Sequence, residues 1–227
     1  DLQYDSGEYA DFMASYDPSF GRVKAITRPA PGNHDYQTRN GAGYYQYFGA
    51  AAGDPAKGYY SYDVGAWHLV ALNSNCFAVS CAAGSAQERW LRADLAAHPT
   101  SCALVYWHHP LYSSGGEHGN NPGMAALYQA AIDGGVDVAL AGHDHHYERF
   151  ALQDAAGHAS PTGIREFVVG SGGRSHYSMG SLQPNSEAHD NSTFGVLALT
   201  LHPTSYDWQF VGEAGTAGAD AGHQACH

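Results

Sequence analysis

The sequence has no long apolar run and few basic residues. No stretch approaches the roughly 20 consecutive apolar residues of a membrane-spanning helix, so we expect no membrane span. Lys and Arg total 10 against 22 Asp and Glu, which gives a formal net charge of −12. Such a surface has no general attraction for nucleic acid or for an anionic membrane. We therefore expect neither partner, and an anionic ligand would need a local positive charge such as a metal ion.

The four cysteines include no Cys-x-x-Cys pair, which argues against a zinc ribbon. Cys76 and Cys81 share one short loop, whereas Cys102 precedes an apolar run and Cys226 is the penultimate residue. The pairing least demanding of the chain is Cys76–Cys81 with Cys102–Cys226. Free thiols in a cytosolic enzyme are the alternative. Disulfides would require an oxidising compartment, so we expect a secreted protein.

A length of 227 residues with 44% apolar residues fits one large domain. We expect this domain to cover residues 1–212. Residues 213–227 are rich in Gly and Ala and predict a poorly ordered tail, unless Cys226 holds it in place. The sequence has no internal repeat, charge block or low-complexity linker that would indicate a second domain.

Hydrophobic periodicity and turn residues predict the order of helices and strands. The predicted elements are a helix within 7–16, an extended run over 23–27, a hairpin over 59–73, a helix from the capping box at 85–88 to about residue 98, a strand over 103–107, a helix over 122–133, and strands over 136–141, 164–169, 194–201 and 206–211. Strands that alternate with helices predict an α/β fold, and the strand-rich last third predicts a second sheet.

Two histidines follow the apolar run 136–141 directly. His143 and His145 are two residues apart, which places both rings on the same side of an extended segment, where they could bind one metal ion or two adjacent ones. His146 would point the other way. The sequence contains 15 histidines, so position alone separates ligands from ordinary core or surface residues.

Three other loops carry side chains that can bind metal ions. Asn33 and His34 follow Gly32 at the end of an extended segment, and taken alone they fit a turn-stabilising Asn beside an exposed His. His108 and His109 end the strand 103–107, and side-chain alternation does not decide which of them faces the site.

The third loop is the start of the chain. Asp1 supplies a carboxylate able to bridge two cations, and Tyr4 supplies a phenol suited to a highly charged ion such as Fe(III). Taken alone, both could be surface residues. Ligand sites in open α/β sheets lie outside the carboxyl ends of the strands. Together, the four loops therefore predict one shared metal site.

Four motifs in this order resemble the second to fifth motifs of the purple acid phosphatase branch of the calcineurin-like metallophosphoesterases. They are Asp-x-x-Tyr at 1–4, Gly-Asn-His-Asp at 32–35, Val-x-x-His at 105–108, and Gly-His-x-His followed by Tyr-Glu-Arg at 142–149. The resemblance covers residues 1 to about 150. It implies a metallophosphoesterase-type sandwich of two β-sheets flanked by helices.

The resemblance also implies two metal ions, Fe(III) and a divalent ion such as Zn, Mn or Fe. The implied ligands are Asp1 for both ions, Tyr4 and His145 for Fe(III), and Asn33, His108 and His143 for the divalent ion. His108 is thereby selected over His109. The implied reaction is the hydrolysis of a small phosphomonoester by a hydroxide that the metals generate, as in an acid phosphatase.

Further roles follow from the same resemblance. His34 would contact the phosphate, and His118 would contact it or protonate the leaving group. Asp35, Glu148 and Arg149 would not bind the ions themselves but would orient the side chains that do.

The first motif of the family, an Asp on an N-terminal strand, is not in the sequence, and neither is the Gly expected before Asp1. We expect this motif, its strand and a signal peptide to lie upstream of Asp1, and the chain alone to be an incomplete enzyme. One alternative function is a phosphodiesterase on the same metal centre. Another is a secreted protein that binds metal or phosphate without turnover.

Overall fold

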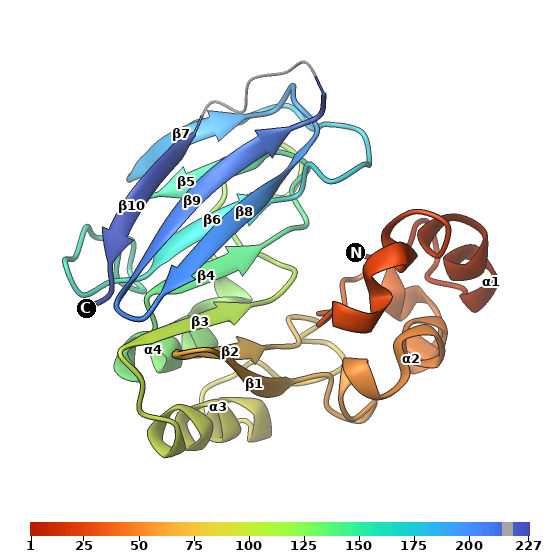
Figure 1. Cartoon of the computed structure of the whole chain (residues 1–227), viewed down its shortest axis with the longest axis horizontal. Coiled ribbons are helices and arrows are strands. Elements are labelled where there is room, and N and C mark those ends of the chain that lie inside the picture. The colour runs from red at the N-terminus through yellow and green to blue at the C-terminus, as the bar shows by residue number, and fades with distance from the viewer. Residues whose placement is uncertain (215–219) are drawn as a thin grey trace.

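Two β-sheets packed face to face form the frame of the protein (Figure 1). The computed structural model describes residues 1–214 and 220–227. The larger sheet has seven strands in the order β1-β2-β3-β4-β6-β5-β7, and the smaller has three in the order β10-β9-β8. Helices flank the larger sheet, which confirms the expected α/β fold class.

Four neighbouring strands of the larger sheet, β2, β3, β4 and β6, run parallel, so their carboxyl ends reach the same edge. The strands of this sheet are β1 (Tyr60–Val64), β2 (Trp67–Ala71), β3 (Cys102–Tyr106), β4 (Val138–Ala141), β5 (Tyr147–Phe150), β6 (Arg165–Val169) and β7 (Ser186–Asp190). β1 and β2 form the predicted hairpin, whose turn contains Gly65 at a φ of 60°.

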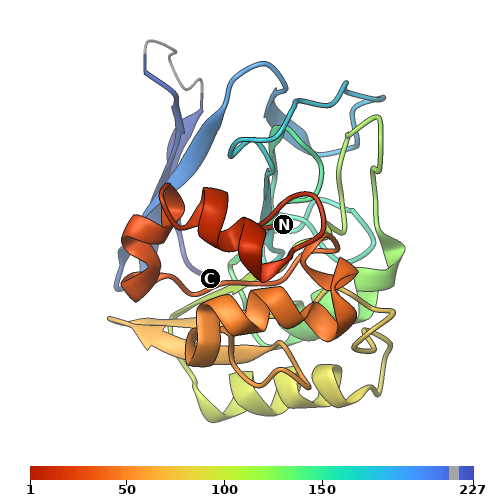
Figure 2. The ribbon, with the colours of Figure 1, turned by 90° about the vertical axis from the view of Figure 1, so that its right-hand side faces the viewer.

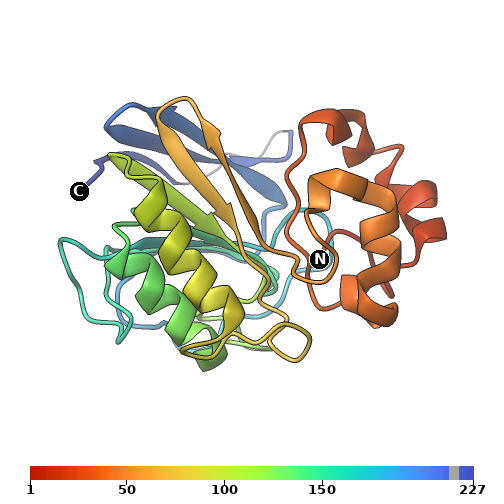
Figure 3. The same cartoon turned by 90° about the horizontal axis from the view of Figure 1, so that it is seen from below.

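Opposite faces of the larger sheet are covered by helices and by the smaller sheet (Figure 3). The helices are α3 (Ala86–Ala97), the 3₁₀ helix η6 (Pro122–Met124) and α4 (Ala125–Asp133). Ser85 caps α3 as its sequence predicted, because its side chain accepts a hydrogen bond of 3.2 Å from the Glu88 N–H. None of the helices within residues 1–214 and 220–227 has the length and apolar composition for crossing a bilayer.

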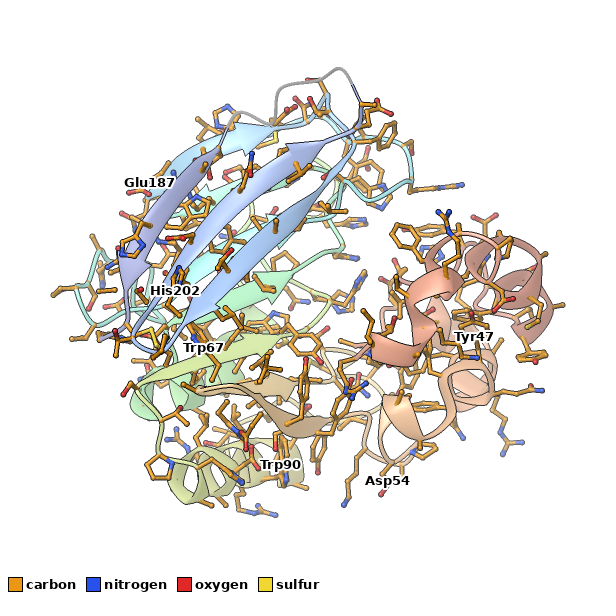
Figure 4. All side chains as sticks on the ribbon, viewed as in Figure 1. Tyr47, Asp54, Trp67, Trp90, Glu187 and His202 are labelled. Atoms are coloured by element: carbon orange, nitrogen blue, oxygen red, sulfur yellow. A yellow bond between two sulfur atoms is a disulfide. The ribbon has the colours of Figure 1, made fainter. Side chains whose placement is uncertain are left out.

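The smaller sheet consists of β8 (Gly195–His202), β9 (Ser205–Gly212) and β10 (Ala221–Ala225). Its inner face buries aromatic side chains, including Trp208 and Phe210, against Leu104 and Phe167 of the larger sheet. Trp67 lies in the same layer (Figure 4), where its indole N–H donates to the His202 carbonyl at 2.6 Å. Burial of these large side chains holds the two sheets together.

The first 52 residues form a helical region that lies across the end of the sheets (Figure 2). Its elements are α1 (Tyr9–Asp11), the π-helix η1 (Phe12–Tyr16), the 3₁₀ helices η2 (Phe20–Ile26), η3 (Asp35–Gln37) and η4 (Arg39–Gly41), α2 (Ala42–Phe48) and the 3₁₀ helix η5 (Gly49–Ala52). Phe12, Tyr44 and Tyr47 pack into an aromatic cluster, and Tyr47 is labelled in Figure 4. The helix predicted within 7–16 is thus present as α1 and η1.

Two sequence predictions about secondary structure are wrong. Residues 23–27 are not extended, because no strand pairs with them and η2 uses local hydrogen bonds instead. The strand over 164–169 does not join the second sheet, because β6 pairs with β4 of the larger one. The tail was expected to be poorly ordered unless Cys226 held it in place. Cys226 forms a disulfide and residues 221–225 form β10 on β9, while residues 215–219 lie outside the described residues.

Both predicted disulfides are present, Cys76–Cys81 and Cys102–Cys226. The second joins the first residue of β3 to the residue after β10, so it ties the larger sheet to the smaller one. The sequence separations are 5 and 124 residues. A longer loop loses more conformational entropy in the unfolded chain when it is closed.

We therefore expect the two disulfides to differ in their contribution to stability. Replacing Cys102 and Cys226 together by Ala should lower the free energy of unfolding by about 5 kcal/mol, against about 2 kcal/mol for the Cys76 and Cys81 pair, from loop closure alone. Urea denaturation of the two double variants measures the difference. Equal losses would contradict an entropic origin.

Candidate metal centre

The predicted site residues come together at the carboxyl edge of the parallel strands. In Figure 1, β3 and β4 point towards the N-terminal helical region. A cavity of about 700 Å³ lies between these parts of the molecule. The residues that line it include Asp1, Tyr4, His108, His143, His145 and Arg174. Segments more than 140 residues apart therefore face one cavity.

A buried carboxylate joins the start of the chain to the loop that carries Asn33. Asp35 accepts hydrogen bonds from the backbone N–H groups of Gly32 at 2.9 Å, Leu2 at 3.1 Å and Gln3 at 3.3 Å. Its side chain has no exposed surface, and this burial raises its pKa. Gly32 is required here, because a Cβ would lie 2.2 Å from Asp1 Oδ1. Asp35 thus positions both segments.

Three ligand-type atoms from other segments surround the Nε2 atom of His108. Its Nε2 lies 3.0 Å from Asn33 Oδ1, 3.1 Å from His143 Nδ1 and 3.2 Å from Asp1 Oδ2. A single ring nitrogen carries at most one proton, so hydrogen bonding cannot satisfy all three contacts at once. Two imidazoles, a carboxylate and an amide oxygen form a donor set that fits a divalent transition-metal ion.

The ring nitrogens of this cluster are suited to hold a cation. Burial lowers the pKa of His108 and of His143 well below the usual range, so both rings are neutral near pH 7 and offer lone pairs. His109 also joins the cluster, with one ligand atom within 4.8 Å of those of His108 and His143. Burial lowers the pKa of His109 to about 4, and its Nδ1 lies 2.9 Å from Ser74 Oγ.

Tyr4 and His145 form a second pair of candidate ligands. The Tyr4 hydroxyl lies 3.0 Å from His145 Nε2. His145 Nδ1 lies 2.7 Å from the Ser175 carbonyl, which favours a proton on Nδ1 and leaves Nε2 as the acceptor. Burial raises the pKa of Tyr4 to about 12, so a phenolate at this position requires a neighbouring cation.

The backbone around the two motif histidines differs from the extended segment that their spacing suggested. Residues 143–146 form bends, and His143 has a φ of 67°. This left-handed conformation is costly for a residue with a Cβ and is found at sites where the surrounding structure enforces it. His143 therefore faces His108, while His145 faces Tyr4.

The two predicted substrate-contacting histidines also lie beside the cluster. The His34 ring is 4.1 Å from the Tyr4 ring, and its Nδ1 is 2.5 Å from the Asp5 carbonyl. The His118 ring stacks on the His143 ring at 4.0 Å. His118 is exposed, so its ring is accessible to a ligand in front of the cluster.

Glu148 acts on the loop that carries His118. Its buried carboxylate accepts hydrogen bonds from Ser114 N at 2.8 Å, Ser114 Oγ at 2.5 Å and Ser186 Oγ at 2.6 Å. Asp144, which the sequence analysis did not single out, holds the same loop through the Ser113 hydroxyl and the Gly119 N–H. Both carboxylates belong to the motif segment 142–149, so this segment positions the loop.

The prediction for Arg149 is corrected by its contacts. Its Nε lies 2.7 Å and its Nη2 3.0 Å from the two oxygens of Asp220, and it also pairs with Glu187, which is labelled in Figure 4. Its guanidinium lies 5.0 Å from the Trp208 ring. Arg149 therefore joins the two sheets instead of orienting His143 and His145.

The loop after β6 brings further side chains to the site that no motif in the sequence indicated. Tyr177 stacks on His145 at 3.9 Å, and Arg174 lies 4.8 Å from the Tyr4 ring and 3.4 Å from the Asp5 carboxylate. The signal was the run Gly170-Ser171-Gly172-Gly173 directly after a strand. This loop reaches the site only because β6 runs parallel to β4, and the sequence did not reveal that pairing.

Comparison with known proteins identifies a family and several relatives. Residues 3–147 match the calcineurin-like phosphoesterase family. Purple acid phosphatase 21 of Arabidopsis thaliana is 33% identical over 186 residues, which are 73% of this chain and 41% of the relative. Purple acid phosphatase 22 of the same plant is 35% identical over 120 residues, 51% of this chain and 27% of the relative. Acid phosphatase type 7 of Danio rerio is 29% identical over 176 residues, 66% of this chain and 39% of the relative.

Solved structures show the same fold. Purple acid phosphatase PPD1 from yellow lupin (Lupinus luteus) seeds has a TM-score of 0.74 at 21% identity, covering 88% of this chain and 38% of that protein. GAP50, the anchor in the inner membrane complex of Plasmodium, has a TM-score of 0.56 at 17% identity, covering 74% and 53%. The chain spans about a quarter to two fifths of the length of the curated relatives it matches.

Glu166, the second residue of β6, makes the stability of the fold depend on pH. Burial raises its pKa to about 8, although its carboxyl accepts hydrogen bonds from Leu111 N at 3.0 Å and Tyr112 N at 3.3 Å. The unfolded chain releases this proton near pH 4.5. Between pH 4.5 and 8 the folded state therefore binds one more proton, so the free energy of unfolding falls as the pH rises.

We expect Glu166→Gln to weaken this pH dependence, because each pH unit in the window changes the free energy of unfolding by up to about 1.4 kcal/mol per group. Urea denaturation at intervals between pH 5 and pH 8 measures the slope. The exposed Glu117→Gln serves as the control and should keep the wild-type slope. A wild-type slope in Glu166→Gln would contradict the assignment.

Proposed function

The chain belongs to the calcineurin-like phosphoesterase family, in its purple acid phosphatase-like branch, and from this we propose that it hydrolyses phosphomonoesters at a binuclear metal centre. The observation that carries the proposal is the convergence of Asp1, Asn33 and His143 on His108 Nε2 within 3.2 Å. The pair Tyr4 and His145 beside them supports a second ion.

We assign one ion to Asn33, His108 and His143 and the other to Tyr4 and His145, with Asp1 between them. When bound, two such ions supply positive charge to phosphoryl oxygens and activate water near neutral pH. The phenol of Tyr4 favours Fe(III) at its position, and the imidazole and amide donors favour Zn, Mn or Fe(II) at the other.

His34 and His118 are the groups of this chain placed to bind the phosphoryl group. The His118 ring stacks on His143, and the His34 ring lies tilted against Tyr4, so both rings are close enough to the candidate ligands to donate an N–H to an oxygen bound in front of the cluster. The exposed His118 can also pass a proton from a ring nitrogen to the departing oxygen. Asp144 and Glu148 keep the His118 loop in place for this role.

The overall charge of the chain supports local rather than general attraction of the substrate. With a net charge of −12, the surface repels anions, and the positive charge for a phosphate must come from the centre and from Arg174 at the cavity. We infer a small phosphoester as substrate. The two disulfides support a secreted protein.

Replacing a central ligand tests the proposed activity. In the full-length protein with metals supplied, His108→Ala and His143→Ala should each lower the hydrolysis of a chromogenic phosphomonoester by at least about 1,000-fold, because an intact metal site contributes several kcal/mol to transition-state stabilisation. The control is His158→Ala, whose side chain is exposed on another loop. Near-normal turnover by either ligand variant would exclude this centre as the site of hydrolysis. If the wild type hydrolyses a matched phosphodiester faster than the monoester, the proposed activity is that of a phosphodiesterase.

A spectroscopic experiment tests the assignment of Tyr4. A phenolate bound to Fe(III) gives a visible charge-transfer absorption band, so the iron-loaded protein should be coloured and Tyr4→Phe should lose the band. The matched control is Tyr177→Phe, which removes a hydroxyl beside His145 from a ring that we do not assign as a ligand. An active, iron-loaded protein without a visible band would instead indicate that Tyr4 does not bind the metal.

A further inference from the structure

A second group of metal-binding side chains lies away from the candidate centre. It consists of His68 on β2 with Asp94 and His98 at the end of α3, and one ligand atom from each lies within 4.8 Å of the others. His68 is the second residue of β2 and pairs with Ala103 at the start of β3. The group is therefore at the amino end of the parallel strands, whereas the candidate centre is at their carboxyl end.

His68 is held between two carboxylates. Its ring is 1% exposed, with Nδ1 2.7 Å from Asp63 Oδ1 and Nε2 2.9 Å from Asp94 Oδ2. An Nδ1–H that donates to Asp63 leaves the lone pair on Nε2 directed towards Asp94. Metal-binding histidines in proteins are commonly oriented in this way: a carboxylate accepts a hydrogen bond from one ring nitrogen, and the other ring nitrogen binds the metal.

Asp94 and His98 are four residues apart, so they share one face at the end of α3. Asp94 is largely buried, and its carboxylate also accepts from Ser61 Oγ at 2.9 Å. The His98 side chain is 43% exposed, stacks on His68 with ring centroids 4.4 Å apart, and contacts the Asp94 carbonyl at 2.8 Å through Nδ1. Lone pairs of parallel rings do not converge, so coordination requires His98 to turn out of the stack.

We propose that His68, Asp94 and His98 bind one zinc ion, with solvent completing the coordination on the exposed side of His98. Two imidazoles and one carboxylate match the ligand preference of zinc, and Asp63 acts as the outer carboxylate. The ion replaces the proton between His68 Nε2 and Asp94. It links β2 to the end of α3, so binding stabilises the folded protein and is independent of phosphoester hydrolysis.

Zinc stoichiometry tests this site in the whole chain. Equilibrium dialysis against Zn²⁺ should give one bound ion fewer per chain for His98→Ala than for the wild type. The matched control is His158→Ala, because His158 also lies four residues after an aspartate, Asp154, but within the described residues no third metal-binding side chain joins this pair. The difference between variants is unaffected by the ions that the candidate centre binds. Equal stoichiometry of His98→Ala and wild type would overturn the proposal.

The outer carboxylate provides a second, more conservative test. Asp63 is 63% exposed, so Asp63→Asn should fold normally and weaken zinc binding at this site by about 10- to 100-fold without abolishing it. Thermal unfolding with and without Zn²⁺ gives a parallel measure, since His98→Ala should lose part of the zinc-dependent rise in Tm that His158→Ala keeps. A full wild-type rise in His98→Ala would show that His68 is only a histidine paired with two carboxylates.

Discussion

The shared direction of β2, β3, β4 and β6 is the constraint on which the site depends. Because these neighbouring strands are parallel, the loops that follow β3, β4 and β6 leave the sheet at one edge. That edge collects the histidines after β3 and β4 and the glycine-rich loop after β6. An antiparallel neighbour would have sent one of these loops to the opposite edge, and its side chains could not have joined the cluster.

The N-terminal segment reaches this edge by a different interaction. No strand carries Asp1 and Tyr4 in the described structure, and the buried Asp35 instead holds the segment through three backbone N–H groups. A carboxylate is costly to bury unless hydrogen bonds compensate for its lost hydration. Those same hydrogen bonds determine where Asp1 and Asn33 lie relative to His108, so the geometry of the centre depends on one buried acid.

Burial and charge act in opposite senses at the two histidine groups. At the candidate centre, burial keeps His108 and His143 neutral, so their nitrogens offer lone pairs. At the far end of the sheet, His68 is equally buried but lies between two carboxylates. In both places the position of the ring nitrogens relative to other ligand-type atoms points to a cation more directly than the number of histidines does.

Local patterns in the sequence were sufficient to identify the motif residues and to predict the capped helix α3 and the hairpin, because these depend on neighbours in the chain. They were also sufficient to predict both disulfides, because four cysteines allow few pairings. The tertiary structure alone decided the partner of β6, the approach of Arg174 and Tyr177, the position of His109 and the inter-sheet role of Arg149. These features depend on contacts between segments far apart in the chain. The physical reason is that strand pairing and burial are properties of the whole sheet, which periodicity within one segment does not encode.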